Sequence, residues 1–277
     1  MRIERLRLRL VRLPLVAFFE TSFGRIYDRT FIIVQLDGDG VEGLGECVAD
    51  VDPYYSPETN VTAWHIIKDF LAPLVLGRTF AHPRDVYAAC GRVRGHNMAK
   101  ASIEMAAWDL AARAEDVALS RLLGGTRAEI ASGVSIGIQD SLDQLAHKVE
   151  TELAAGYRRI KIKIKPGWDV SAIGRVRSQF GAIPLMADAN AAYSLDDAAM
   201  LASLDGFDLM MIEQPLDYDD IRDHAALQAA MITTNVTGTS QRVIRIFSGQ
   251  STGCEAFIMR ALRNAPRSPR PRGPSRR

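Results

Sequence analysis

The chain has only three cysteines in 277 residues, and no two of them form a C-x-x-C pair. Cys47, Cys90 and Cys254 are far apart, so the sequence supports neither a disulfide framework nor a zinc site. It also has no run of about 18 apolar residues, the length that a membrane-spanning helix needs. These absences predict a reduced, cytoplasmic protein with no membrane partner.

The N-terminus carries basic residues ahead of apolar ones, as a secretion signal does. However, Leu6, Leu8 and Leu10 alternate with arginines, and the apolar run that follows is short and is interrupted by Pro14. This alternation has the period of a β-strand with one face in water. We therefore interpret these residues as a strand of the folded protein.

Lysine is absent after Lys165, and acidic residues are scarce at the end of the chain. Residues 229–277 contain nine arginines and one acid, Glu255, which gives them a charge of +8; because the whole chain carries +1, the first 228 residues carry −7. Arginines can bind nucleic-acid phosphates, but no aromatic residue alternates with those of residues 261–277 and no recognition motif accompanies them. We predict no nucleic-acid partner, and a disordered Pro- and Arg-rich tail over residues 229–277.

Strand signals dominate the first 50 residues. Residues 31–36 are rich in β-branched side chains, and the turn at residues 37–40 has glycines that tolerate a positive φ. From about residue 56 the pattern becomes helical, most clearly at residues 99–114, where small and apolar side chains recur on one face. Strands followed by a helical cluster predict an α+β domain over residues 1–125.

A different rhythm begins after residue 126, where short apolar strands alternate with amphipathic helices. A polar residue closes each of three successive strands, and 25 positions separate both Lys163 from Asp188 and Asp188 from Glu213. A (β/α)₈ barrel places its site at the carboxyl ends of its strands in this way. The sequence therefore predicts an α/β protein in which the α+β domain of residues 1–125 precedes an incomplete (β/α)₈ barrel over residues 126–228. The strands are predicted at residues 134–138, 159–165, 183–190 and 208–215.

Three lysines share one face of the strand predicted at residues 159–165. Lys161, Lys163 and Lys165 are two positions apart, so their side chains point the same way, whereas the intervening isoleucines face the helices. Neighbouring ammonium groups and partial burial both disfavour protonation, so one such lysine can act as a base near neutral pH. The alternative is a solvated basic face at a sheet edge, and the lysines alone do not separate the two interpretations.

Asp188 and Glu213 each end an apolar strand and precede loop-forming residues. A buried carboxylate is costly unless it is paired or binds a metal. Mg²⁺ (or Mn²⁺) prefers carboxylate oxygens, so both residues are candidate metal ligands. The alternative is that they form ion pairs with the lysines. With a metal, the set would support removal of a proton from the carbon beside a carboxylate, because the cation stabilises the resulting enediolate while a lysine takes the proton.

These motifs resemble the muconate-lactonising branch of the enolase superfamily, and within it o-succinylbenzoate synthases and the related N-succinylamino acid racemases. The likeness covers about residues 1–228 and implies a capping domain followed by a barrel, a bound Mg²⁺ and a small carboxylate substrate. It also implies homo-oligomers for the full-length relatives. The resemblance rests on Lys161-x-Lys163, Asp188-Ala-Asn190, Ile212-Glu-Gln-Pro215 and the stretches at residues 99–109 and 160–169.

The resemblance implies a role for each matching residue. Lys163 corresponds to the acid/base lysine of the family and Lys161 to its partner, whereas Asp188 and Glu213 correspond to the first two metal ligands. The implied reaction is a syn loss of water from a succinyl-bearing cyclohexadiene carboxylate in menaquinone biosynthesis. Substrate contacts are implied for Ser135, Asn190, Phe19 and Phe23, the last two in a loop at residues 18–24 that closes over the substrate in the family.

The pattern stops near residue 229. The 25-residue spacing predicts a third acidic ligand near position 238, which is Gly238, and no lysine is present to serve as a second base. We hypothesise that the sequence from about residue 229 is read out of frame or comes from a rearranged gene, and we expect little or no activity. The alternatives are an N-succinylamino acid racemase or dipeptide epimerase, which the missing second base disfavours more strongly, and a non-catalytic fragment.

Overall fold

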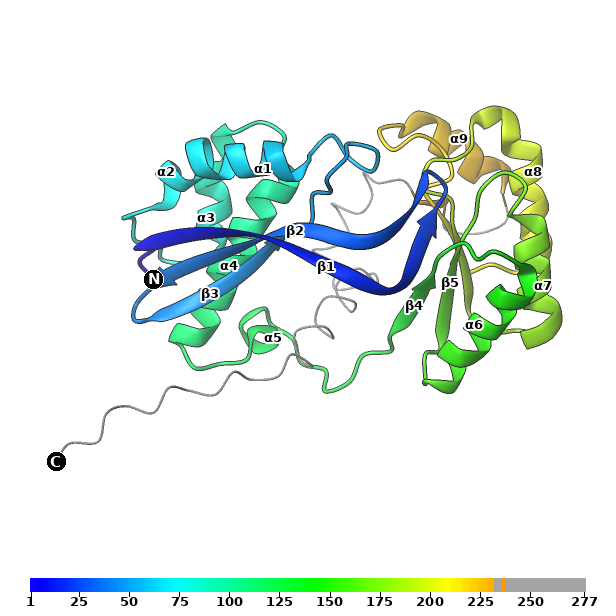
Figure 1. The fold of residues 1–277 in the computed structure, drawn as a ribbon, viewed down its shortest axis with the longest axis horizontal. Coiled ribbons are helices and arrows are strands. Elements are labelled where there is room, and N and C mark those ends of the chain that lie inside the picture. Colours follow the sequence, from blue (N-terminus) through cyan, green and yellow to red (C-terminus); the bar gives the residue numbers. More distant parts are fainter. Residues whose placement is uncertain (232–235, 238–277) are drawn as a thin grey trace. The chain divides into compact units, whose positions relative to one another are not determined.

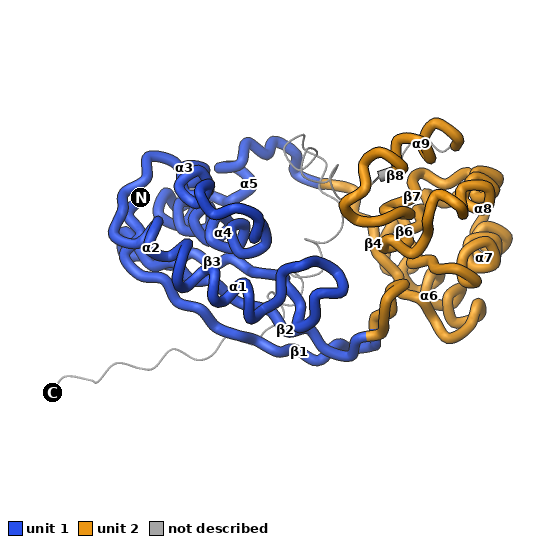
Figure 2. Tube along the Cα trace, turned by 90° about the horizontal axis from the view of Figure 1, so that it is seen from above, with its two compact units in different colours: residues 1–18, 26–129 blue, residues 19–25, 130–277 orange. Residues whose placement is uncertain are grey.

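The computed structural model describes residues 1–231 and the backbone of residues 236–237 (Figure 1). The chain divides into two compact units, coloured separately in Figure 2. Unit 1 comprises Met1–Phe18 and Ile26–Glu129, and unit 2 comprises Phe19–Arg25 and the residues from Ile130 onward. The short segment Phe19–Arg25 therefore belongs to the second unit, although it lies near the start of the chain.

The first sheet has three strands in the order β1-β2-β3, and β2 pairs antiparallel with β3 as the sequence predicts. In the turn between them, Asp39 and Gly40 have φ values of 50° and 78°. Gly38 does not have the positive φ that the sequence predicts for the glycines of this turn. It instead permits a close approach of the backbone, because a Cβ on it would lie 1.8 Å from the carbonyl oxygen of Arg2. The strands are β1 (Arg5–Thr21), β2 (Gly24–Gly38) and β3 (Val41–Cys47).

The longest helix of unit 1, α4, packs closely on β3. A Cβ on Gly43 would lie 2.3 Å from both the Ala106 oxygen and the Leu110 nitrogen, so only glycine permits this approach. The predicted helix at residues 99–114 is confirmed and begins two residues earlier. The helical elements are α1 (Asn60–Ile66), η1 (Ile67–Leu71), α2 (Ala72–Val75), α3 (Arg84–Ala89), η2 (Cys90–Arg92), α4 (Asn97–Ala114) and α5 (Leu119–Leu122).

Unit 2 is built on a sheet with strand order β4-β5-β6-β7-β8, and every neighbouring pair is parallel. This order confirms the predicted succession of βα units. The strands are β4 (Gly133–Ile136), β5 (Arg159–Lys163), β6 (Leu185–Asp188), β7 (Met211–Glu213) and β8 (Val236–Thr237). The helical elements are α6 (Leu142–Ala154), α7 (Val170–Phe180), η3 (Leu195–Asp197), α8 (Ala198–Ser203), η4 (Leu204–Phe207) and α9 (Arg222–Ala230).

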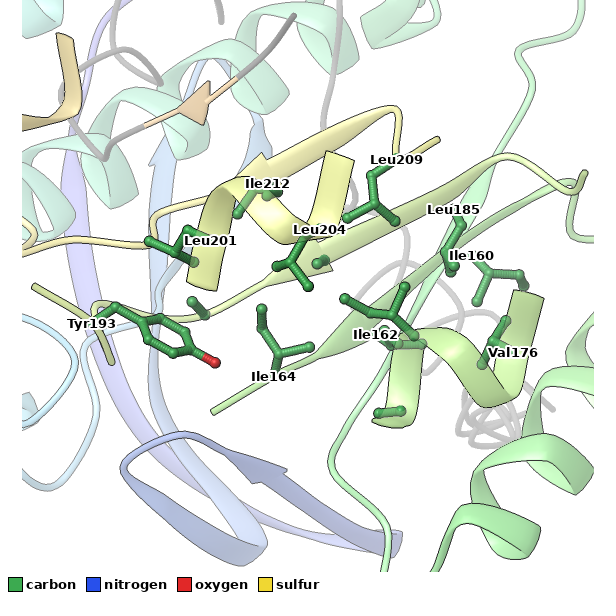
Figure 3. Close-up of a cluster of buried hydrophobic side chains, with 14 of the residues drawn as sticks. Ile160, Ile162, Ile164, Val176, Leu185, Tyr193, Leu201, Leu204, Leu209 and Ile212 are labelled. Atoms are coloured by element: carbon green, nitrogen blue, oxygen red, sulfur yellow. The ribbon is translucent and has the colours of Figure 1, made fainter. Parts of the chain in front are cut away.

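The predicted alternation along β5 is confirmed by burial. Ile160, Ile162 and Ile164 are at most 1% exposed and join the apolar cluster under the helices. Figure 3 shows these side chains with Val176 of α7 and Leu185 of β6 among their neighbours. Helices α6, α7 and α8 lie along one side of the sheet (Figure 1).

Arg177 of α7 connects this helix to the loops around it. Its guanidinium donates four hydrogen bonds to backbone carbonyls, at 2.6 to 2.8 Å. A planar guanidinium has enough donors to satisfy all four carbonyls at once. Arg177 therefore fixes the end of α7 against its neighbours, through the oxygens of Gly181, Ile183, Phe207 and Asp208.

The parallel sheet continues beyond residue 229. Helix α9 ends at Ala230, and β8 then pairs with β7, which places Thr237 beside Glu213. The boundary that the sequence predicts at residue 229 thus falls inside α9, and a fifth strand follows it. Residues 232–235 and 238–277, which include Gly238 and most of the tail predicted to be disordered, lie outside the described residues.

None of the helices in the described part of the chain combines the length and the apolar character needed to cross a bilayer.

Candidate active site at the strand ends

Lys163, Asp188 and Glu213 end three adjacent strands and form one row across the sheet. Parallel pairing places Lys163 beside Asp188, and Asp188 beside Glu213. The two equal spacings in the sequence therefore correspond to register partners in space. Their side chains are only 8%, 1% and 4% exposed, respectively. The structure thus brings these three predicted residues together in a buried cluster.

Lys161 joins the same cluster, two residues before Lys163 on β5. Its Nζ lies 2.7 Å from Glu213 Oε2 and 3.1 Å from Asp188 Oδ2. Lys163 Nζ lies 2.6 Å from the same Asp188 oxygen. The alternative in which the carboxylates pair with the lysines is therefore present in the structure. Two ammonium groups balance two carboxylates, which offsets part of the desolvation cost of burying them.

The ionisation of Asp188 depends on its two lysine neighbours. Burial alone would raise the pKa of its carboxyl group, but the charges of Lys163 and Lys161 and their hydrogen bonds outweigh that effect. The pKa of Asp188 consequently lies below its ordinary value. Asp188 is therefore a carboxylate at neutral pH, which is the form that can bind a cation.

Lys165 departs from the prediction that all three lysines lie on one strand. β5 ends at Lys163, and Lys165 lies in a turn in which its backbone exchanges hydrogen bonds with Trp168. Its Nζ is 2.9 Å from Oε1 of Glu20, in the segment Phe19–Arg25. The lysines do not form a solvated basic face, because each has a carboxylate partner from a distant part of the chain.

Ser135 and Asn190 contribute two buried polar atoms. Ser135 on β4 is the register partner of Lys161, and Asn190 follows Asp188 by two residues and donates its backbone N–H to Asp188 Oδ1 at 3.1 Å. Ser135 Oγ and Asn190 Oδ1 are both buried with no hydrogen-bond partner among the described residues. Buried polar atoms nearly always have a partner, so these two are available to a ligand.

The two predicted aromatic residues differ in their placement. The Phe19 ring packs against the loop after β4, since a Cβ on Gly137 would lie 3.2 Å from Phe19 Cδ2. Phe23 is 46% exposed. Of the two, only Phe19 is therefore placed beside the strand ends by these observations.

Strained backbone at the strand ends was not predicted. Asn190, Ala191 and Gln214 all have positive φ values, of 46°, 64° and 49°. A hydrogen bond of 2.8 Å from the Ala191 N–H to the Gln214 carbonyl ties two of these residues together. Such conformations cost about 1–3 kcal/mol each and are concentrated at functional sites. Asparagine adopts this conformation more often than most residues, but alanine and glutamine rarely do, so nothing in the residue types signals it at Ala191 or Gln214.

The residues present fit a cation held by two carboxylates. Within residues 1–231, no three His, Cys, Asp or Glu side chains are grouped as a larger metal centre would require. Asp188 and Glu213 nevertheless supply hard oxygen donors, and Mg²⁺ is often held by one or two carboxylates together with water and substrate. Lys161 Nζ bridges both carboxylates, which shows that they favour positive charge between them. The next register position on β8 is Thr237 rather than an acid.

Each of the two units matches a known protein family. The family described as mandelate racemase / muconate lactonizing enzyme, N-terminal domain, matches residues 6–124. The family described as enolase C-terminal domain-like matches residues 144–245. An α+β unit followed by parallel βα units with acids and lysines at the strand ends agrees with both matches. The chain belongs to the enolase superfamily, which confirms the family predicted from the motifs.

Curated relatives make the likeness more specific. An o-succinylbenzoate synthase of Geobacillus kaustophilus is 51% identical over 232 residues, which cover 83% of this chain and 62% of the relative. An N-succinylamino acid racemase of Thermus thermophilus is 47% identical over 84% of this chain and 63% of the relative. An o-succinylbenzoate synthase of Listeria innocua is 39% identical over 94% and 70%, respectively. The chain spans 62% of the length of the Geobacillus relative.

A solved structure agrees with the fold. A racemase from Streptomyces coelicolor, described with bound magnesium, superimposes with a TM-score of 0.76 at 27% identity. The match covers 84% of this chain and 68% of the racemase. The match extends the likeness to a racemase that has been solved with bound magnesium, the metal predicted here.

Proposed function

We propose that the buried row at the strand ends is the site of a lyase that removes a proton next to a carboxylate and then eliminates water. The observation that carries the proposal is the convergence of Lys163, Asp188 and Glu213 at register positions of adjacent strands. The relatives named o-succinylbenzoate synthase favour a succinyl-bearing cyclohexadiene carboxylate as the substrate class.

The proposed roles follow from position. Lys163 takes the proton and returns it to the departing hydroxide, which a syn elimination allows because both groups leave from one face. Lys161 offers its ammonium to the substrate carboxylate. Asp188 and Glu213 would hold Mg²⁺. When bound there, the cation would supply electrostatic stabilisation of the negative charge that develops on the substrate carboxylate. Ser135 and Asn190 would direct their buried oxygens toward the substrate.

An N-succinylamino acid racemase is the second candidate, because one relative with that name is 47% identical. Racemisation needs a base on each face of the reacting carbon. No lysine follows Lys165 within these 277 residues, so this stretch of chain offers no lysine for a second base. A lyase that uses Lys163 for both proton transfers needs no such partner. The lysines of the described residues therefore suit the proposed lyase. We propose that its efficiency is low, since Thr237 rather than an acid stands beside Glu213.

The experiment compares the wild-type chain with Lys163→Ala and with Lys148→Ala, a surface variant on α6 whose lysine pairs with Glu152. Water loss from the cyclohexadiene substrate is followed with and without Mg²⁺, and deuterium incorporation is followed on both enantiomers of an N-succinylamino acid. We expect slow, Mg²⁺-dependent water loss that Lys163→Ala abolishes and Lys148→Ala retains. A rate more than about tenfold below that of a full-length relative is expected for an incomplete ligand set.

Each remaining outcome rejects part of the proposal. Exchange of both enantiomers by the wild-type chain would favour the racemase. Water loss that survives Lys163→Ala would remove Lys163 from the reaction. No water loss at any Mg²⁺ concentration, from a chain that remains folded, would identify a non-catalytic member of the superfamily. Turnover within about tenfold of a full-length relative would contradict the low efficiency proposed here.

A further inference from the structure

Charged side chains hold the segment Phe19–Arg25 against the strand ends of unit 2. Glu20 is at the centre of this network. Lys165 Nζ lies 2.9 Å from Glu20 Oε1, and Arg25 Nε lies 2.6 Å from Glu20 Oε2. Arg25 also pairs with Asp140, in the loop after β4. Glu20 is thus held by one cation from its own segment and by one from the turn that follows β5.

Backbone contacts attach the same segment to two further loops. The Ile138 N–H, after β4, donates to the Glu20 carbonyl at 2.9 Å. Ser22 Oγ, in the segment, donates to the Asn190 carbonyl, after β6, at 3.2 Å. With the Lys165 contact after β5, the segment is joined to the loops that follow three successive strands. Two of these loops, those after β5 and β6, continue from the strand ends that carry Lys163 and Asp188.

The Lys165–Glu20 ion pair is less exposed to solvent than an ordinary surface ion pair. The Glu20 side chain is only 13% exposed, whereas that of Lys165 is 38% exposed. Burial alone would raise the pKa of Glu20, but hydrogen bonds from Lys165 and Arg25 outweigh it and hold the pKa below its ordinary value. Glu20 is therefore charged at neutral pH. The base of Lys165 is also fixed, because its backbone exchanges hydrogen bonds with Trp168.

Lys165 consequently has a different carboxylate partner from the other two lysines of this region. Lys161 and Lys163 both contact Asp188, whereas Lys165 contacts a residue 145 positions away in the chain. We propose that Lys165 is a positioning residue whose ion pair with Glu20 holds the segment Phe19–Arg25 across the strand ends that carry Lys163 and Asp188. The proposal rests on these contacts alone, so it stands whether or not the chain turns over a substrate.

Hydrogen exchange of the intact chain tests this role. In Lys165→Gln, we expect the amides of residues 19–25 and of Ile138 to exchange about three to five times faster, the size expected for losing one partly exposed ion pair. Amides of Ile160 and Ile162 in β5 should not change, because the core does not depend on Lys165. Lys165→Arg should retain wild-type exchange, since it keeps the charge. Lys148→Gln, which breaks a surface pair on α6, is the matched control and should have no effect on the segment.

Two further measurements separate an electrostatic anchor from a general loss of stability. At about 1 M salt, where the screening length is about 3 Å, wild-type exchange in the segment should rise toward that of Lys165→Gln. In a Glu20→Gln background, Lys165→Gln should have almost no additional effect. The proposal is overturned if Lys165→Gln leaves the segment unchanged, if β5 amides accelerate equally, or if Lys165→Arg behaves like Lys165→Gln.

Discussion

Lys163 and Asp188 are partners in two respects, because their backbones are register partners on neighbouring strands and their side chains meet at 2.6 Å. The first relationship follows from the βα repeat and places the two residues side by side. The second neutralises two charges that are almost fully buried. The pair therefore contributes to the fold of unit 2 as well as to the proposed chemistry.

Replacing Lys163 should destabilise unit 2. In Lys163→Met the Asp188 carboxylate keeps only Lys161 as a cationic partner. We therefore expect a loss of about 3 kcal/mol in the free energy of unfolding, at the lower end for a broken buried pair. Urea unfolding measures this loss. Adding Asp188→Asn should restore part of the stability, because the uncompensated charge is gone. Strictly additive effects of the two substitutions would show that the pair is not coupled.

Lys161 should compete with Mg²⁺ for the two carboxylates. Its Nζ lies within 3.1 Å of both Asp188 and Glu213, where a bound cation would repel it. Lys161→Met should therefore tighten Mg²⁺ binding by about fivefold or more, the scale expected for removing one nearby like charge. The measurement is the rise of the thermal midpoint with Mg²⁺ concentration. Asp188→Asn should abolish this rise, and equal Mg²⁺ responses in Lys161→Met and wild type would contradict the assignment.

Gly43 should be irreplaceable at the contact between β3 and α4. A Cβ in Gly43→Ala would meet the backbone of α4 at 2.3 Å, so the helix must move away from the sheet. We expect a loss of about 3 kcal/mol in the stability of unit 1, at the upper end for overpacking. Gly91→Ala is the control, because no atom of another part of the described chain lies within 4 Å of its added Cβ. Similar stabilities of the two variants would be inconsistent with the packing described here.

Arg177→Lys should weaken unit 2 although the charge is kept. A lysine ammonium cannot reach four carbonyls spread over two loops, so two or three of these part-buried and exposed acceptors lose their protein donor. We expect a loss of about 2–3 kcal/mol in the free energy of unfolding. Arg175→Lys is the control, since Arg175 pairs with an Asp143 side chain that is 89% exposed. A stability loss no larger than that of the control would show that the four hydrogen bonds contribute little.

Cys47 and Cys90 should be nearly inert to alkylation at neutral pH. Burial raises the pKa of each thiol to about 11, from an ordinary value of 9.0. Only the thiolate reacts, so a two-unit rise lowers its population at pH 8 about 100-fold, and reaction should accelerate as the pH approaches 11. Mass spectrometry of iodoacetamide labelling, with and without denaturant, measures each site. Rapid labelling of Cys47 in the native protein would contradict its burial.

Much of the site was predictable because the spacing of its residues along the chain follows from strand alternation and from the length of one βα unit. Strand alternation placed Ile160, Ile162 and Ile164 toward the helices, and burial confirms that placement. The equal spacing from Lys163 to Asp188 to Glu213 was predictable because each interval is one βα unit. The strained backbone at Ala191 was not, since its conformation depends on the hydrogen bond from its N–H to the Gln214 carbonyl in the next strand-end loop.

The sequence alone determined which side chains face the helices and which strands end in a polar residue, through residue types and their periodicity. These are properties of short stretches of chain, in which side-chain direction follows the backbone repeat. Only the tertiary structure decided which carboxylate each lysine meets. Lys161 pairs with Glu213 across 52 positions and Lys165 with Glu20 across 145. Such pairings arise from the packing of separate elements, and neither composition nor spacing specifies how distant segments pack.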